Sequence, residues 1–470
     1  MTALRFTARA LVLIAALLGL RLILAATLPL ADTTEARYAE IARLMAVTGD
    51  WITPWFEPGV PFWGKPPASF WTQAISFKLF DVTAFAGRLP SWIATVATTA
   101  LIARTRPGTT GVMASLIYIT MALPFVCAGT VMTDTFLALG TTLSLTAILI
   151  RLENGATHWG WLFFIGLAIG LLSKGPLTLV LVGFPVGVWL LISGDWRRLW
   201  RALPWVGGTV LVSVLVVPWY VLAEIKTPGF LDYFLIGEHF KRFLVSEWAG
   251  DLYGSAHDYP RGTIWLHWLM ASFPWGIFAL FVMLGRWLSG SRPFPHQNTP
   301  DPYRLNGLIL TAALTPLIFF TLAGNILWTY VLPGLPFAAL LIARLVMPMM
   351  HRGHLKPVLA LILLLTPLIA GAAGGWFSLN PEALKTEGPL LARVNAEVTY
   401  IDHRPYSARF YSSGSADLME RGELLQRMQS DPAALPEKLA IKRGDQTLAE
   451  SISGHYREID SNLRYRLFTR

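Results

Sequence analysis

Eleven long apolar stretches divide this chain of 470 residues and constrain its fold more than any other feature. A helix needs about 20 apolar residues to cross the hydrocarbon core of a membrane. The stretches run roughly over residues 8–30, 84–103, 110–127, 131–150, 158–173, 175–193, 203–223, 263–285, 305–323, 326–347 and 357–377. Charged residues make up only 14% of the chain, against about a quarter in soluble domains. The sequence therefore predicts a polytopic α-helical membrane protein, with about 11–13 transmembrane helices.

Basic residues in the short loops set the predicted orientation. Arginines follow the second, fourth and sixth stretches, at positions 104, 106, 151, 197, 198 and 201. The positive-inside rule makes that side cytoplasmic. The opposite, outer side then receives two longer loops, 31–83 and 224–262, and a polar tail. We predict a membrane part over residues 1–377 and a small soluble α/β domain over residues 378–470.

Local patterns predict further elements on the outer side. In the first outer loop, residues 35–45 and 66–80 are expected to form helices that lie along the membrane surface. In the tail, we expect strands over 397–401, 408–411 and 463–468 and a helix over 417–428. The net charge of +9 is spread in short clusters between apolar stretches, which indicates contact with membrane lipid and not with nucleic acid. The single cysteine, Cys127, excludes a disulfide framework and a thiolate metal cage.

Ionisable residues gather at the outer ends of the apolar stretches. Such groups are costly at membrane level, so a cluster of them on one face indicates a functional site. With the predicted orientation, the outer face receives Asp32, Glu35, Lys65, Asp134, Lys174, Glu238 and His239.

Each of these residues also has a purely structural interpretation. Asp32 and Glu35 have the spacing of a helix-capping box, and Asp134 at a helix start would complement the helix dipole. Lys65 and Lys174 would be interfacial anchors or, in a functional interpretation, would bind phosphate as point charges.

Glu238 and His239 are followed by Lys241 and Arg242, a combination that suits a metal, a phosphate or ordinary loop packing. No second histidine stands at metal-ligand spacing from His239, so the sequence gives a metal little support. Gly-rich phosphate loops and Gly-x-Ser-x-Gly elbows are absent from the sequence.

Several ordered motifs resemble one family, the bacterial GT-C glycosyltransferases. It includes the lipid A aminoarabinose transferases and their protein O-mannosyltransferase relatives. The resemblance covers essentially the whole membrane part in order, and the tail resembles the periplasmic domain that closes such chains. The motifs are DTTEARYAEIAR at 32–43, GDWITP at 49–54, GKPP at 64–67, AGRLPS at 86–91, MTDT at 132–135, SKGP at 173–176, Glu238-His239 with Arg242-Phe243, and YVLP at 330–333.

The resemblance implies an inverting sugar transfer from a polyprenyl phosphate in a cavity that faces the periplasm of a bacterial inner membrane. By motif, Lys65, Arg242 and Tyr330 would bind the lipid phosphate, and the acid of the first outer loop and Asp134 would face sugar and acceptor. We add Lys174, Glu238 and Arg37 to the predicted substrate- and phosphate-binding residues, and Glu35, Asp32 and Asp134 form the predicted catalytic set.

The chain departs from the family pattern at three places. Thr34 replaces an aspartate that often precedes the glutamate, which leaves open whether Asp32 or Glu35 is the working acid. Gly64 replaces a glutamate that would pair with His239 around a metal. The loss of this partner argues against a metal at His239. A divalent metal is kept as an alternative, and no cofactor is otherwise expected. Asn325 to Trp328 stands where the family commonly has a lysine ahead of the Tyr-x-Leu-Pro motif.

Taken together, the sequence predicts a glycosyltransferase that moves a sugar from a polyprenyl phosphate to a lipid A-type glycolipid. Transfer to protein Ser or Thr, as in a protein O-mannosyltransferase, is the alternative enzyme. A lipid-sugar flippase is the alternative from another class, although the paired repeats and broken helices typical of transporters are not visible in the sequence.

Overall fold

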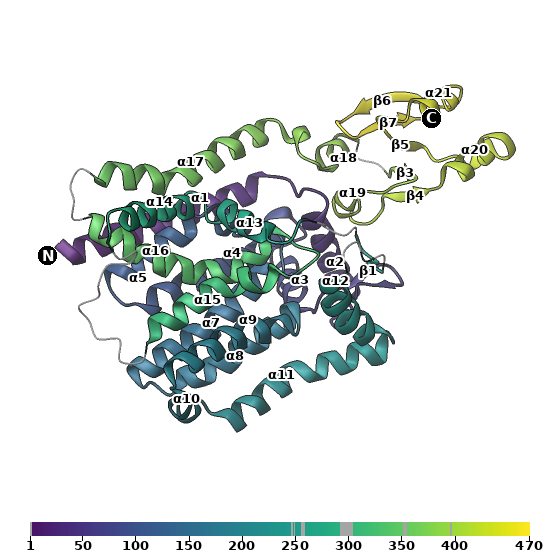
Figure 1. The fold of residues 1–470 in the computed structure, drawn as a ribbon. Helices are drawn as coiled ribbons and strands as arrows, with labels where there is room; N and C mark the ends of the chain where they lie inside the picture. Colours follow the sequence, from purple (N-terminus) through teal and green to yellow (C-terminus); the bar gives the residue numbers. More distant parts are fainter. Residues whose placement is uncertain are drawn as a thin grey trace.

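The computed structural model describes residues 2–245, 248, 250–254, 259–291, 304–350, 355–394 and 397–470. Parts of the predicted outer loop 224–262, namely 246–247, 249 and 255–258, lie outside the described residues. Most of the chain is helical, and a small sheet domain forms from its last residues (Figure 1). The predicted fold class is confirmed.

A helix or a helix pair occupies each of the eleven apolar stretches. Among the described residues, five helices are long and apolar enough to cross a membrane alone, or six if the pair α13–α14, bent by 104°, is one span. The count of eleven spans stays a prediction. The elements are α1 (Thr2–Thr27), α4 (Ala84–Thr105), α5 (Thr109–Thr120) with α6 (Ala122–Cys127), α7 (Asp134–Asn154), α8 (His158–Lys174), α9 (Leu177–Ser193), α11 (Trp205–Lys226), α13 (Thr263–Ala271) with α14 (Trp275–Leu288), α15 (Leu305–Phe320), the 3-10 helix η2 (Trp328–Gly334) with α16 (Leu335–Met350), and α17 (Lys356–Leu379).

Small residues let the central helices of the bundle approach closely. A Cβ atom added to Gly140 of α7 would lie 2.7 Å from the carbonyl oxygen of Gly166 in α8, and one added to Gly166 would lie 2.4 Å from Oγ of Ser144. Ser144 also donates a 2.9 Å hydrogen bond to the carbonyl of Phe163. Membrane helices pack by this close contact, because lipid gives apolar side chains little reason to associate. The pair α7–α8 thereby fixes the ends of both helices, which carry Asp134 and Lys174.

The two helices predicted in the first outer loop are confirmed. They are α2 (Thr34–Thr48) and α3 (Ala68–Phe80), and a short hairpin of β1 (Trp55–Glu57) and β2 (Val60–Pro61) lies between them. After α11, the chain forms the π-helix η1 (Asp232–Lys241) and the short α12 (Arg242–Leu244), and the connection before α11 contains α10 (Trp196–Ala202). Figure 1 shows α2, α3, β1 and α12 at one end of the bundle, with the N-terminus at the opposite end.

The tail forms a five-stranded mixed sheet in the order β4-β3-β5-β7-β6. Strand β3 is parallel to β4 and β5, and β7 is antiparallel to β5 and β6. The elements are the 3-10 turn η4 (Pro381–Ala383), α18 (Gly388–Val394), β3 (Thr399–Ile401), α19 (Tyr406–Tyr411), β4 (Asp417–Met419), α20 (Arg421–Ser430), the 3-10 turn η5 (Pro432–Ala434), β5 (Lys438–Lys442), α21 (Gln446–Ser451), β6 (Arg457–Ser461) and β7 (Tyr465–Thr469).

The local predictions for the tail were correct only in part. Strands over 397–401 and 463–468 correspond to β3 and β7, whereas the strand predicted over 408–411 is part of helix α19. The helix predicted over 417–428 begins only at Arg421, after the short strand β4. The segment 408–411 alternates between apolar and polar side chains as a strand would, but the four consecutive residues from Ser407 to Phe410 of α19 are all buried. Tertiary packing overrides the local alternation here.

The tail packs against the first outer loop, which places both at the same end of the bundle (Figure 1). Asp32 accepts hydrogen bonds from the backbone N–H and the hydroxyl of Ser407, at 2.9 and 2.6 Å, and forms a 2.6 Å ion pair with Arg464. Arg409 pairs with Glu57 of β1 at 2.9 Å. The membrane part and the tail thus share a polar contact built from both predicted outer segments.

Candidate active site

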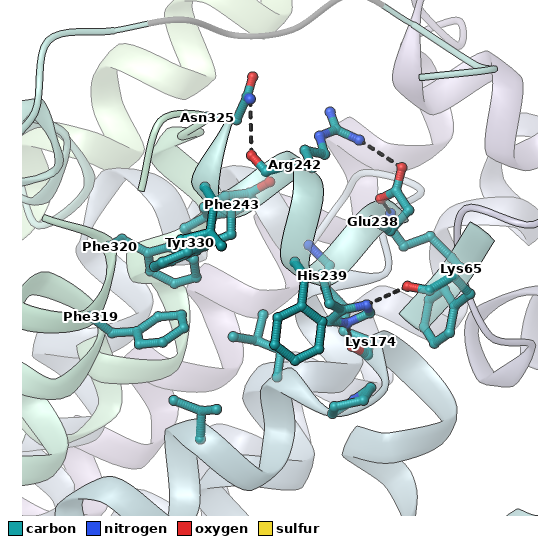
Figure 2. A pocket seen from close by; sticks show the side chains of 16 residues that line it. Lys65, Lys174, Glu238, His239, Arg242, Phe243, Phe319, Phe320, Asn325 and Tyr330 are labelled. Carbon is teal, nitrogen blue, oxygen red and sulfur yellow. Dashed lines mark hydrogen bonds and ion pairs between the residues drawn. The ribbon is translucent and has the colours of Figure 1, made fainter. Parts of the chain in front are cut away.

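A cavity of about 420 Å³ opens at the end of the bundle that carries the outer loops (Figure 2). It has polar groups at one side and aromatic and aliphatic walls at the other. Its lining residues are Lys65, Lys174, Pro176, Leu177, Val180, Phe234, Glu238, His239, Phe240, Arg242, Phe243, Leu244, Phe319, Phe320, Asn325 and Tyr330. Six of the predicted site residues are among them, although they come from segments up to 265 positions apart, between Lys65 and Tyr330.

Glu238 holds two of the cavity's cations. Its carboxylate accepts from Nζ of Lys65 at 2.9 Å and from Nη1 of Arg242 at 2.9 Å (Figure 2). Arg242 also lies 3.4 Å from Asp251 of the same outer loop. Burial alone would raise the pKa of Glu238, but the nearby Lys65 and Arg242 lower it to about 2. The carboxylate is therefore ionised at neutral pH.

Lys174 and Asp134 form a second ion pair at the cavity wall. Nζ of Lys174 donates to Oδ1 of Asp134 at 2.7 Å and lies 5.2 Å from the ring centroid of Tyr330. Lys174 is the last residue of α8 and Asp134 the first of α7, so the close packing of these helices brings the pair together. A turn follows at Gly175, which has φ of +62°. A left-handed backbone favours glycine there, and a Cβ would lie 2.6 Å from the ring of Phe234.

His239 uses both ring nitrogens in contacts with backbone carbonyls. Nδ1 lies 2.7 Å from the carbonyl oxygen of Phe234, and Nε2 lies 3.0 Å from that of Lys174. A metal ligand needs a nitrogen lone pair directed at the ion, and neither nitrogen offers one in this arrangement. The described residues contain no group of three His, Cys, Asp or Glu that could hold a metal ion. The metal role considered for His239 is thus not supported, and its contacts join η1 to the end of α8.

Asn325 and the aromatic residues fix the far wall of the cavity. The side-chain amide of Asn325 donates to the carbonyl of Arg242 at 3.0 Å, and the backbone N–H of Gly324 donates to that of Phe243 at 3.1 Å (Figure 2). The ring of Phe243 stacks on Phe319 with centroids 4.8 Å apart. The segment 324–330 therefore holds Arg242 at the polar side of the cavity, and the aromatic rings form the wall of its apolar side.

Four predicted residues do not line the cavity as the described residues form it. Asp134 is connected to it through its ion pair with Lys174, and the other three make contacts elsewhere. Glu35 pairs with Arg88 of α4, and Asp32 with Arg464 of the tail. The guanidinium of Arg37 donates to the carbonyl of Tyr253 and lies 5.3 Å from the ring centroid of Tyr38. These contacts hold the first outer loop to its neighbours, so the catalytic and substrate-binding roles of the three residues stay predictions.

Sequence reasoning missed three residues that hold predicted site residues in place. Arg88 lies in the motif AGRLPS, but its ion-pair partner Glu35 is 53 positions away in the sequence. The residues around Arg88 therefore do not indicate this pairing. Asp251 has only its charge in an otherwise irregular loop. Asn325 was noted merely as the replacement for a lysine, although a polar residue between apolar stretches was a signal for a role in the site.

Known proteins are similar to this chain in sequence and in fold. A model of the family described as dolichyl-phosphate-mannose-protein mannosyltransferase matches residues 6–234. Undecaprenyl phosphate-alpha-4-amino-4-deoxy-L-arabinose arabinosyl transferase of Aeromonas hydrophila is 30% identical over 340 residues, covering 69% of this chain and 57% of the relative. The protein of the same name from Pseudomonas aeruginosa is 29% identical over 335 residues, covering 68% and 56%. This chain thus spans a little over half the length of these relatives.

Solved structures share the fold over nearly the whole chain. ArnT from Cupriavidus metallidurans bound to undecaprenyl phosphate aligns with a TM-score of 0.72 at 19% identity, covering 98% of both chains. The archaeal oligosaccharyltransferase AglB from Archaeoglobus fulgidus aligns with a TM-score of 0.52 at 10% identity, covering 91% of this chain and 69% of that one.

The fold is therefore that of the GT-C membrane glycosyltransferases. In sequence, the chain is similar to glycosyltransferases of the lipid A aminoarabinose transferase type, and the resemblance predicted from its motifs is confirmed.

Proposed function

We propose that this chain transfers a sugar from a polyprenyl phosphate donor to a glycolipid acceptor of the lipid A type, at the periplasmic face of a bacterial inner membrane. The observation that carries the proposal is the division of the cavity into a cationic side and an apolar side. A polyprenyl phosphate has the matching division into an anionic head and a hydrocarbon chain. The names of the similar proteins, which act on undecaprenyl phosphate-linked aminoarabinose, support the same donor class.

The apolar wall suits the isoprenoid part of the donor. Leu177, Val180, Phe243, Phe319 and Phe320 line it without a charged side chain between them. Ligand cavities are commonly apolar with a few polar groups that fix the orientation of the ligand. A lipid that enters beside these residues brings its phosphate toward Lys65, Lys174 and Arg242.

The cations supply the chemistry at the leaving group. When the bond between the sugar's anomeric carbon and the phosphate oxygen breaks, the electron pair and negative charge pass to that oxygen. Lys65 and Arg242, held by Glu238, stabilise this developing charge. The acceptor oxygen attacks the anomeric carbon from the opposite side in a single displacement, so we propose an inverting transfer.

Asp134 is the proposed acid nearest to the cavity, because its ion pair partner Lys174 lines the wall. In that position it orients Lys174 toward the phosphate. A sugar or protein hydroxyl acceptor needs a base to take its proton, whereas an acceptor phosphate is already ionised at neutral pH. Each of the three predicted catalytic acids is engaged by a cation. A glycolipid phosphate as acceptor is compatible with this, because it needs no free carboxylate as a base.

Protein O-mannosylation is the second candidate, because the matching family model is described as a protein mannosyltransferase. The two functions differ in acceptor and share the donor chemistry. They are separated by offering the purified protein either lipid A or a Ser/Thr-rich peptide, each with its polyprenyl-phosphate sugar.

The experiment uses the full chain in nanodiscs with radiolabelled polyprenyl-phosphate aminoarabinose and lipid A. Lys65→Ala is expected to lower turnover by roughly tenfold to thousandfold, the range for one lost donor to the transition state. Lys78→Ala, an exposed lysine of α3 in the same outer loop, is the matched control and should keep wild-type turnover. Movement of donor lipid between leaflets without sugar transfer would instead identify a transporter and refute the proposal.

A further inference from the structure

A second polar cavity, of about 600 Å³, lies in the tail domain, apart from the membrane-level site. Residues that follow or begin four different strands form its wall. They are His403 after β3, Arg421 after β4, Lys442, Gly444 and Asp445 at the end of β5, and Arg464 and Tyr465 at the start of β7.

The strand order explains why these residues meet. Strands β4, β3 and β5 are parallel neighbours, so their carboxyl ends lie at one edge of the sheet. The chain leaves β3 for β4 on one side and then crosses to β5 on the other side of β3. Open α/β sheets bind ligands in the crevice at such a reversal, outside the carboxyl ends of the strands. The cavity occupies this position.

The cavity has more positive than negative side chains. Arg421 is held by Asp402 at 3.2 Å and by Asp445, and Arg464 by Asp32 at 2.6 Å and by Glu387 at 3.6 Å. Lys442 is exposed, and its ammonium group has no hydrogen-bond or ion-pair partner among the described residues. Two guanidiniums are thus fixed in place by carboxylates, and a third cation stands free beside them.

His403 is a further polar residue of the cavity wall. Its Nδ1 lies 2.9 Å from the hydroxyl of Tyr465. Burial, together with the charges of Lys442 and Arg464, lowers the pKa of His403. The imidazole is therefore neutral at pH 7 and offers a polar edge without adding charge to the wall.

We propose that this cavity binds a phosphate group carried by a saccharide. Fixed guanidiniums recognise phosphate oxygens through paired N–H groups, and the free ammonium of Lys442 adds a point charge. Ligand cavities hold drug-sized molecules at roughly 300–1,000 Å³, so a volume of about 600 Å³ leaves room for the sugar as well as the phosphate.

Arg464 connects the cavity to the membrane part. The same guanidinium that lines the cavity pairs with Asp32 at the start of the first outer loop. A saccharide phosphate held there lies at the contact between the tail and the outer end of the bundle. If the proposed function holds, the ligand is the phosphorylated headgroup of the glycolipid acceptor, and this assignment rests on that function. The proposal that the cavity binds a phosphorylated saccharide does not depend on that function.

Direct binding tests the proposal without turnover. Glucose 1-phosphate is titrated into the full chain in neutral phosphatidylcholine nanodiscs, with glucose as the uncharged control ligand. Lys442→Gln should weaken binding of glucose 1-phosphate about tenfold, as loss of one hydrogen bond to a charged group does. Arg457→Gln, which removes one positive charge from the exposed edge strand β6 of the same sheet, should bind as wild type does.

The outcomes distinguish a saccharide phosphate from a lipid headgroup as the ligand. They also distinguish failure of this phosphate site from failure of the proposed function. Unchanged affinity in nanodiscs with phosphatidylglycerol indicates a saccharide phosphate, and weakened affinity indicates that a lipid headgroup occupies the same phosphate site. Equal binding by wild type and Lys442→Gln, or equal loss in Arg457→Gln, overturns the site. Sugar transfer is measured separately, so its absence refutes the proposed function while binding of glucose 1-phosphate still stands.

Discussion

Replacing Glu35 by glutamine tests whether this acid takes part in chemistry or holds the first outer loop against α4. Its Oε1 accepts from Nε of Arg88 at 2.8 Å and from the backbone N–H of Val131 at 3.1 Å. Its Oε2 accepts from Nη2 of Arg88 at 2.8 Å and from the backbone N–H of Ala31 at 3.2 Å. Four donors thus converge on one carboxylate, and the two side chains of the ion pair are 12% and 4% exposed.

The magnitude follows from this burial. Removing one partner of a buried ion pair costs roughly 3–5 kcal/mol, because the other charge is left uncompensated. Arg88 keeps the carbonyls of Ala25 and Pro29 as acceptors, and glutamine keeps one acceptor oxygen, so we expect about 3 kcal/mol. Replacing Arg88 by glutamine as well removes the unpaired charge. The double variant should then lose less than the sum of the single losses, by roughly 0.5–3 kcal/mol.

The assay combines thermal unfolding of the detergent-solubilised chain with turnover per folded molecule. Glu35→Gln should unfold at a clearly lower temperature, and its folded fraction should transfer sugar at a rate within a few fold of wild type. Glu382→Gln is the matched control, because Glu382 pairs with Arg393 at the surface with 46% and 42% of the side chains exposed. Such pairs contribute about 0–1 kcal/mol. Wild-type thermal stability of Glu35→Gln together with a hundredfold loss of turnover would refute this reasoning and assign Glu35 to the chemistry.

Two further predictions concern other ion pairs. Asp134→Asn leaves Lys174 without its carboxylate at the cavity wall, and we expect turnover to fall at least tenfold; wild-type kinetics would remove this pair from the site. In the tail, burial raises the pKa of Glu387 from 4.5 to about 7. Its protonated form is therefore favoured on folding, and this contribution to stability is complete below about pH 4.5 and lost as pH rises through about 7. Glu387→Gln should flatten the dependence of the tail's unfolding temperature on pH between 5 and 8, and an unchanged slope would show that other groups cause it.

The sequence predicted the membrane part well because its signals are local and strong. Apolar stretches of bilayer length and arginines in short loops located the helices and the loops, and the confirmed helices α2 and α3 followed from periodicity. Lys65 and Arg242 were predicted to bind the same lipid phosphate and Glu238 to belong to the same binding residues, but no direct contact among the three was predicted. Their direct contacts depend on η1, a π-helix that no simple periodicity of the sequence indicates.

The tail shows where sequence reasoning failed. Strands β5 and β6 were missed because each is short and carries charged residues, as in REIDS at 457–461. Both strands pair with β7, one on each side of it. Strand β6 is next to β7 in the sequence, whereas β5 meets β7 only after the chain has passed through α21 and β6, so the pairing of β5 is not visible in its own sequence. The same limit applies to Asp32, whose spacing to Glu35 suggested a helix cap, while the structure shows it bound to Ser407 and Arg464 more than 370 positions away.

The charge balance of the main cavity bears on how the proposed reaction proceeds. Three cations line the cavity, namely Lys65, Lys174 and Arg242. They pair with three carboxylates: Glu238 in the lining, and Asp134 and Asp251 next to it. Buried charges are costly unless paired, so this balance allows the cations to remain at membrane level before donor binds. A donor phosphodiester carries one negative charge, whereas the departing polyprenyl phosphate gains a second on the leaving oxygen. The carboxylates of the protein already bind the cations and compete with the donor for them. The intact donor, with a single negative charge, is therefore stabilised little by the cations, whereas the additional charge that develops during bond cleavage is stabilised more. Interactions that strengthen only toward the transition state raise the rate of the chemical step, and this arrangement has that property.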